Sequence, residues 1–360
     1  MKRLAGKCIP EHMPSPLQSL EFFQDAYDRR ILQLREEREQ GIKIIGTFCL
    51  YVPDEIIFAS GADRIVLCGG RADTIAVAEQ SLPRNICPLI KSSFGAVIDA
   101  CCGGSLACPH VPLVDVVVAE ATCDGKKKMY EILADSIPTY VLDLPQKPGS
   151  PEAQEYFLSE IRKFGRFMES LTGNVISDDG LRKEIRSSNE TRRLLHRLFR
   201  LRRRDPPPIR GSDVLRVMQK QFFLSPDVFR HGIRQLCDAL EHIVPEGKTG
   251  PRIMISGCPI AAGNTKVPDI VEQKGGLIVV EESCTGTRSF WDPVDEDRDP
   301  WNALAARYLE IPCACMTPTD QRVARIVDLA KHYNVQGVVY YTLQFCHAYN
   351  IERLHVQKAL

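Results

Sequence analysis

Several features that would mark common protein classes are absent from this sequence. No apolar run approaches about 18 residues and the N-terminus has no apolar signal segment, so we expect no membrane span and no secretory signal. The 46 basic and 46 acidic side chains give a formal net charge of zero, unlike a dedicated nucleic-acid binder. We therefore expect a cytoplasmic protein with no nucleic-acid partner and no membrane partner.

Short nucleotide-binding and metal-binding motifs are missing as well. There is no GxGxxG fingerprint, and Gly247-Lys248-Thr249 lacks the upstream glycine of a phosphate-binding loop. The cysteines form neither a CxxC pair nor a ferredoxin-type run. We expect no dinucleotide and no ATP on this chain, and any metal centre must use cysteines that are far apart in sequence.

Cysteine is abundant, with 14 residues in a chain of 360, and many of them follow a short apolar strand. A residue just past the carboxyl end of a buried parallel strand lies in the crevice where open α/β sheets bind ligands. Several thiols that converge there form the arrangement that an iron–sulfur cluster requires. The predicted strands with their cysteines are 41–48 with Cys49, 64–67 with Cys68, 114–122 with Cys123, 252–257 with Cys258, 277–283 with Cys284 and 338–345 with Cys346.

Other cysteines have simpler explanations. Free cysteine usually behaves as a small buried hydrophobic residue. Cys108 precedes the strand 114–122, so we expect it at the opposite edge of the sheet from Cys123, in a structural role. The residues that we expect to be buried and structural are Cys8, Cys101, Cys102 and Cys237.

Hydrophobic periodicity divides the chain into four parts. Residues 1–40 form an N-terminal helical segment, and residues 151–250 form a helical middle segment. Residues 41–150 and 251–360 each alternate helices with short apolar strands that lack a polar face, which is typical of parallel sheets. The sequence therefore predicts an α/β fold with two doubly wound parallel-sheet domains.

The two α/β domains look like a degenerate repeat, because their cysteines occur in the same order. Insertions in surface loops would explain why the offsets between the halves drift. Packed face to face, the two domains would bring both sets of thiols into one interdomain cleft. The matching residues are Cys49 with Cys258, Cys68 with Cys284, Cys123 with Cys346, and Cys87 with Cys313 or Cys315.

Charged residues near these cysteines give weaker signals, and the catalytic residues stay unknown. Glu55 could handle protons, although a carboxylate at a helix N-terminus is equally explained by the helix dipole. Lys126 begins a run of three lysines after Cys123, either in a solvated turn or as a cation for a reduced cluster or a substrate phosphate. The basic run 192–204 is either a solvated helix face or a docking site for an acidic partner.

Longer segments carry a more specific signal. They are GTFCLYVPDEIIFASGA (46–62), LPRNICPLIKSSFG (82–95), EATCDGKKKMYEIL (120–133), ISGCP (255–259), VVEESCTGTR (279–288), RYLEIPCACMTPTDQR (307–322) and YYTLQFCHAY (340–349). Together they resemble the 2-hydroxyacyl-CoA dehydratase/benzoyl-CoA reductase superfamily over roughly residues 40 to 358. The parts TCDGKKK, CACMTP and LQFC resemble most the double-cubane cluster proteins of that superfamily.

This resemblance implies a low-potential iron–sulfur reductase that acts on a small molecule. It implies electrons delivered by a separate ATP-hydrolysing [4Fe-4S] activator protein, and a homodimer. In the dehydratase branch three cysteines hold one cubane, and these match Cys87, Cys123 and Cys346. In the double-cubane branch six cysteines hold two sulfide-bridged [4Fe-4S] units. Our choice for the further ligands is Cys49, Cys284 and Cys315, with Cys68, Cys258 and Cys313 in reserve.

Two other functions remain open at this point. One is a subunit of a 2-hydroxyacyl-CoA dehydratase or benzoyl-CoA reductase-like complex, which would need a second, different subunit and a groove for CoA. The other is a non-catalytic cluster carrier. The sequence names no physiological substrate.

Overall fold

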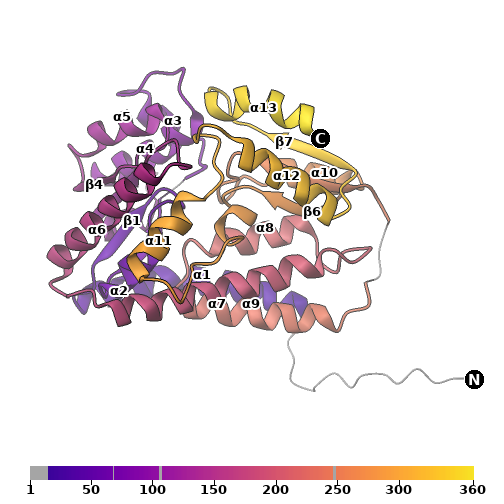
Figure 1. Cartoon of the computed structure of the whole chain (residues 1–360), viewed down its shortest axis with the longest axis horizontal. Helices are drawn as coiled ribbons and strands as arrows, with labels where there is room; N and C mark the ends of the chain where they lie inside the picture. The colour runs from indigo at the N-terminus through magenta and orange to yellow at the C-terminus, as the bar shows by residue number, and fades with distance from the viewer. Residues whose placement is uncertain (1–14, 68, 105–107, 246–248) are drawn as a thin grey trace, which may run out of the picture.

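The computed structural model describes residues 15–67, 69–104, 108–245 and 249–360. In these ranges the chain forms two parallel β-sheets, one of four strands and one of three, with helices around them (Figure 1). The predicted α/β class with two parallel sheets is therefore confirmed. No helix within the described ranges is long and apolar enough to cross a membrane.

The first sheet has the strand order β2-β1-β3-β4, with all neighbours parallel. Strands β1 and β3 are buried at every residue, as expected for apolar strands in a sheet that is covered on both faces. The predicted strands are present, with ends shifted by a few residues. The elements are β1 (Ile44–Thr47), α2 (Asp54–Ala59), β2 (Asp63–Val66), α3 (Ile75–Ala78), α4 (Pro88–Cys101), η1 (Val111–Leu113), β3 (Val116–Glu120), α5 (Asp124–Leu133) and β4 (Thr139–Leu142).

The second sheet has the strand order β6-β5-β7, again parallel throughout. Its first strand β5 lies between β6 and β7, just as β1 lies between β2 and β3 in the first sheet. The carboxyl ends of the strands in each sheet therefore share one edge. The elements are β5 (Arg252–Gly257), α10 (Lys266–Gln273), β6 (Leu277–Glu282), η2 (Thr287–Ser289), α11 (Pro300–Leu309), α12 (Asp320–His332), β7 (Gly337–Tyr341) and α13 (His347–Ala359).

Helices fill the segment between the two sheets, as the periodicity predicts. Each buries an apolar stripe; in α7 this stripe includes Leu181, Ile185 and Leu195. The N-terminal helix packs on α9, where the rings of Phe23 and Phe229 lie 5.8 Å apart. Figure 1 shows α7 and α9 side by side beneath the sheets. These helices are α1 (Pro16–Glu39), α6 (Pro151–Thr172), α7 (Asp178–Leu201), α8 (Gly211–Lys220) and α9 (Pro226–Glu241).

The basic run 192–204 is only in part the solvated face that the sequence allows. Arg193, Arg200 and Arg203 are exposed, whereas three other arginines pair with carboxylates of this chain. The run therefore connects α7 to α2, α9 and β6. The pairs are Arg192 with Glu55 at 2.9 Å, Arg197 with Asp238 and Glu241 at 2.7 Å each, and Arg202 with Glu281 at 2.6 Å.

Of the cysteines expected to be structural, Cys237 is fully buried as predicted. The prediction is wrong for Cys101 and Cys102, which are exposed where α4 ends, because the buried part of that helix stops at Val97. The sulfur of Cys108 lies 3.5 Å from Nδ1 of His110, in a half-buried position. Cys8 and Cys68 lie outside the described residues.

Candidate functional site

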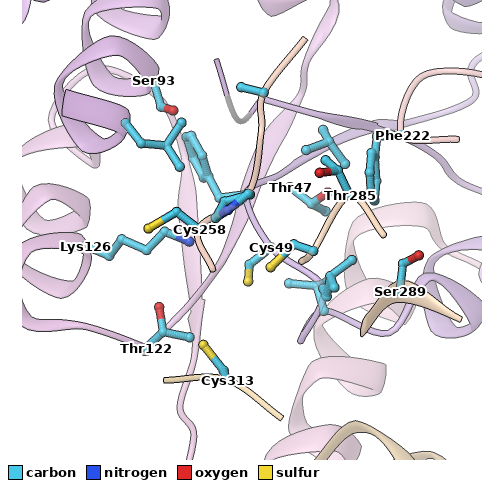
Figure 2. A pocket seen from close by; sticks show the side chains of 18 of the residues that line it. Thr47, Cys49, Ser93, Thr122, Lys126, Phe222, Cys258, Thr285, Ser289 and Cys313 are labelled. Atoms are coloured by element: carbon cyan, nitrogen blue, oxygen red, sulfur yellow. The ribbon is translucent and has the colours of Figure 1, made fainter. Parts of the chain in front are cut away.

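A cavity of about 540 Å³ lies where the carboxyl ends of both sheets meet. Helices α5, α7 and α11 and the loops that follow the strands contribute to its wall. Figure 2 shows Cys49, Cys258 and Cys313 around this space together with Lys126. All six cysteines proposed as ligands line the cavity, and so do two of the three reserves. The lining cysteines are Cys49, Cys87, Cys123, Cys258, Cys284, Cys313, Cys315 and Cys346.

Three of these cysteines occupy the N-cap positions of helices. Cys87 precedes α4, Cys123 precedes α5 and Cys346 precedes α13. Backbone N–H groups of the first turn face each sulfur, from Leu89 to Cys87 and from Lys126 to Cys123, for example. Because a helix N-terminus presents unpaired N–H donors and a partial positive charge, it favours an anionic sulfur.

The thiols form a continuous array around the cavity. Cys346 lies close enough to Cys87 and Cys258 for these thiols to shift its pKa, which Cys258 raises and Cys87 lowers. At the other end, the interaction between Cys313 and Cys315 lowers the pKa of Cys313 and raises that of Cys315. The thiols therefore form two groups, one of Cys87, Cys258 and Cys346 and one of Cys313 and Cys315. Cys49 and Cys284 lie near Cys313, and Cys123 lies between the ends, within electrostatic range of Cys87 and Cys315.

Lys126 lies against this array and not in a solvated turn, which excludes one of the two sequence interpretations. Its ammonium group donates to the fully buried carboxylate of Glu120. Burial raises the pKa of Cys49 and Cys123, and the charge of Lys126 partly opposes that shift. The hydroxyl of Tyr130 and Oε2 of Glu120 are buried with no hydrogen-bond partner in the described part of the chain.

Two buried arginines support the other end of the array. Arg288 and Arg322 share the carboxylate of Glu282, at 3.1 and 2.8 Å. Both guanidinium groups lie against the ring of Tyr349, 5.4 and 5.1 Å from its centroid. The hydroxyl of Tyr349 accepts a hydrogen bond from Arg288 and lies 4.0 Å from the sulfur of Cys313. The positive charges of Arg288 and Arg322 thus act on Cys313, and the carboxylate of Glu282 neutralises them in part.

Glu55, the other sequence candidate, also lines the cavity, but it is held by hydrogen bonds. Its carboxylate accepts from Arg192 at 2.9 Å, and from Ser188 and Tyr308 at 2.6 Å each. Burial alone would raise the pKa of Glu55, but Arg192 and the two hydroxyl donors hold it below its usual range. Glu55 is therefore a fixed carboxylate that positions the wall, which argues against the predicted role in proton transfer.

The potential metal ligands at this cavity are mainly thiols. Among the described residues, no three side chains of His, Cys, Asp or Glu lie close enough together to hold one metal ion. The thiols are spread around a cavity instead, and soft sulfur is the ligand type that iron–sulfur clusters use.

Sequence reasoning missed Arg288, Tyr349 and Arg307, which all contribute to this site. Arg288 closes the segment 279–288, and Arg307 opens the segment 307–322, so the motifs contained both residues without indicating a role. Burial and contacts with residues elsewhere in the chain assign that role, and no local pattern reveals it.

Comparison with known proteins places this site in context. Residues 49–360 match the family described as 2-hydroxyglutaryl-CoA dehydratase, D-component. The chain is 37% identical over 344 residues to "Putative dehydratase subunit YjiM" of Escherichia coli (strain K12), covering 93% of this chain and 87% of that protein. It is 22% identical to the (R)-phenyllactyl-CoA dehydratase beta subunit of Clostridium sporogenes, covering 90% and 85%. It is 21% identical to a benzoyl-CoA reductase subunit of Thauera aromatica, covering 88% and 82%.

Proposed function

The chain belongs to the 2-hydroxyacyl-CoA dehydratase/benzoyl-CoA reductase family, and from this premise we propose that it is the iron–sulfur subunit of a reductive enzyme of that kind. The observation that carries the proposal is the convergence of eight cysteines on one cavity. Relatives with this sequence pattern are named as dehydratase and reductase subunits, which supports a role within a larger enzyme.

The residues of the cavity fit a [4Fe-4S] cluster on three grounds. The donors are thiols, which are the soft ligands that iron–sulfur clusters use. Cys87, Cys123 and Cys346, the three residues that we propose as ligands of one cubane, all lie at helix N-termini that favour anionic sulfur. The buried hydroxyl of Tyr130, which lacks an acceptor in the described ranges, is a further donor near Cys123. When bound, such a cluster supplies single electrons at low potential.

A second candidate is the double-cubane reductase, favoured by the number of thiols. One cubane with three protein ligands leaves five of the eight lining cysteines unexplained. We propose Cys49, Cys284 and Cys315 as ligands of a second, sulfide-bridged [4Fe-4S] unit, with Cys258 and Cys313 as the alternatives inside the cavity. The matching strand orders of the two sheets support a degenerate repeat in which each half contributes part of the array.

The protein's own side chains would then set the properties of the bound group. Lys126, Arg288 and Arg322 place positive charge beside the thiols, which favours a reduced, more anionic cluster. Apolar side chains such as Leu50, Val52 and Phe222 line part of the cavity. Since the sequence has no phosphate-binding loop, we propose that electrons come from a separate ATP-hydrolysing [4Fe-4S] activator protein. We also propose that the chain works as a homodimer or beside a different companion chain.

Iron and sulfide counts on anaerobically purified protein test this proposal. About eight irons per chain supports two cubanes, about four supports the dehydratase-type subunit, and protein that takes up no iron during anaerobic reconstitution refutes both. Turnover with a mild reductant, without ATP and without a second protein, would refute the need for an activator.

A further inference from the structure

Strand β7 lies at an open edge of the second sheet. It pairs with β5 on one side and, within the described ranges, with no strand on the other. All five residues of Gly337–Tyr341 are half-buried. Figure 1 shows β7 beside α13, next to the C-terminal end of the chain. An edge strand of this kind presents backbone N–H and C=O groups that can pair with another polypeptide.

The composition of β7 does not suit an exposed edge. Its sequence, Gly-Val-Val-Tyr-Tyr, contains neither the charge nor the proline that commonly protects an edge strand from pairing. Other edges are covered by this chain itself. The N–H of Val66 in β2 donates to the backbone oxygen of Phe222 at 3.1 Å. Nη2 of Arg202 donates to the backbone oxygen of Ile278 in β6 at 2.9 Å.

The first sheet shows what occupies the matching position. Strands β3 and β7 each pair with the first strand of their sheet, and each leads to a helix with a cysteine at its N-cap, Cys123 or Cys346. On its outer side β3 pairs in parallel with β4, with Glu120 opposite Leu142, and β3 is buried at every residue. No counterpart of β4 appears in the second sheet within the described ranges. The open edge of β7 is therefore the position of a fourth, parallel strand.

A groove of about 550 Å³ lies at this position. Residues of β7, α12 and α13 line it. Val338 and Tyr340 contribute from the strand, and Val356 and Leu360 contribute from α13. The side chain of Leu360 is 52% exposed, so the groove offers apolar surface to a ligand. When an extended peptide adds to a sheet edge, backbone hydrogen bonds supply affinity and such apolar pockets hold alternate side chains.

We propose that the open edge of β7 binds an extended, uncharged and apolar segment of a companion polypeptide as a fourth strand parallel to β7. The direction and the composition follow from β4, whose sequence is Thr-Tyr-Val-Leu. A second copy of this chain is a different occupant, because pairing of β7 with its own copy across a two-fold axis is antiparallel. This inference goes beyond the proposed function, since it rests on backbone pairing and not on a cluster.

A tethered strand tests the inference on the full chain. The chain is extended after Leu360 by a copy of its own residues 135–144, which contain β4 and the loop before it. Tethering raises the local concentration of the strand. Hydrogen–deuterium exchange at Gly337–Tyr341, followed by mass spectrometry, should therefore be about 10-fold or more slower than in the unextended chain.

The matched control carries the same extension with proline in place of the copied Tyr140 and Val141. Proline has no N–H to donate to a ladder, so this extension should leave the exchange of β7 unchanged. The free peptide 135–144, added in excess to the unextended chain, should slow the exchange as the tethered strand does. Equal exchange in the matched and the proline extensions would overturn the inference.

Two further measurements separate this inference from its alternatives. If exchange at β7 slows as the unextended chain is concentrated, and sedimentation velocity shows a dimer, a second copy covers the edge and the inference is wrong. Iron is counted in the same samples. Slowed exchange in an extended chain that never takes up iron would refute the proposed function and keep the strand site. A loaded cluster without slowed exchange would refute the strand site alone.

Discussion

Glu55→Gln should destabilise the fold strongly, because it removes the charge opposite a buried arginine. The side chain of Glu55 is 1% exposed and that of Arg192 is 8% exposed, at a separation of 2.9 Å. Glutamine preserves the shape but leaves the guanidinium buried without a counterion. Breaking a buried pair in this way costs about 3–5 kcal/mol. That is a large part of the roughly 5–15 kcal/mol that separates folded from unfolded protein.

Urea unfolding of four variants measures this loss. Glu55→Gln should lower the free energy of unfolding by about 3–5 kcal/mol, and adding Arg192→Met should recover much of it, since no unpaired charge then stays buried. The matched control is Arg193→Gln, which breaks a pair with Glu296 at 3.3 Å where the arginine is 64% exposed. That control should cost less than about 1 kcal/mol. Equal costs for Glu55→Gln and Arg193→Gln, or strict additivity with Arg192→Met, would refute the reasoning.

The same residue predicts a dependence on pH. The contacts of Glu55 hold its folded-state pKa below the ordinary value of 4.5. A carboxyl group with a depressed pKa contributes stability that is fully present above its unfolded pKa and is lost as the pH falls through the folded one. Wild-type protein should therefore lose this contribution below about pH 4.5, and Glu55→Gln should lack it at every pH.

Three further substitutions probe the cysteine array and its surroundings. Cys123→Ser should sharply lower the iron content while the chain still folds, because serine is nearly isosteric with cysteine but is a poor ligand for iron. The control is Cys237→Ser, which should keep its iron because Cys237 is buried away from the cavity. Lys126→Gln should keep the iron but make the reduction potential more negative in a redox titration, and an unchanged potential would contradict the role of its charge. Gly257→Ala should lower the thermal midpoint, because its φ is +132° and a Cβ would lie 2.0 Å from the backbone oxygen of Tyr341, whereas Gly149→Ala meets nothing within 4 Å and should be nearly neutral.

The sequence was most informative where local chemistry decides the structure. Apolar runs without alternation predict buried parallel strands, and parallel strands share one carboxyl edge. This rule groups Cys49 with Cys123 and Cys258 with Cys284 and Cys346, and the predicted face-to-face packing of the two domains brings both groups into one cleft. All five line the cavity, whereas Cys68 of the same set lies outside the described residues.

Residues whose roles depend on distant partners could not be predicted in this way. Glu55 and Arg192 are 137 positions apart, so their pairing has no local signature. The basic run on α7 therefore looked like a solvated surface although three of its arginines bind carboxylates inside the molecule.

Helix N-caps give independent support for a functional cysteine site. A serine hydroxyl at an N-cap typically contributes about 1 kcal/mol by accepting an N–H of the first turn. Helices α1, α6 and α7 each begin with a serine that makes such a bond, namely Ser15, Ser150 and Ser177. At the cavity, α4, α5 and α13 begin with a cysteine instead, and at none of the three does the side chain make a cap hydrogen bond of the kind that the serines make. Sequences depart from local rules mainly where function requires it. Three helices that begin with a cysteine at one cavity are what the proposed ligation would require, and the iron content of Cys123→Ser tests it.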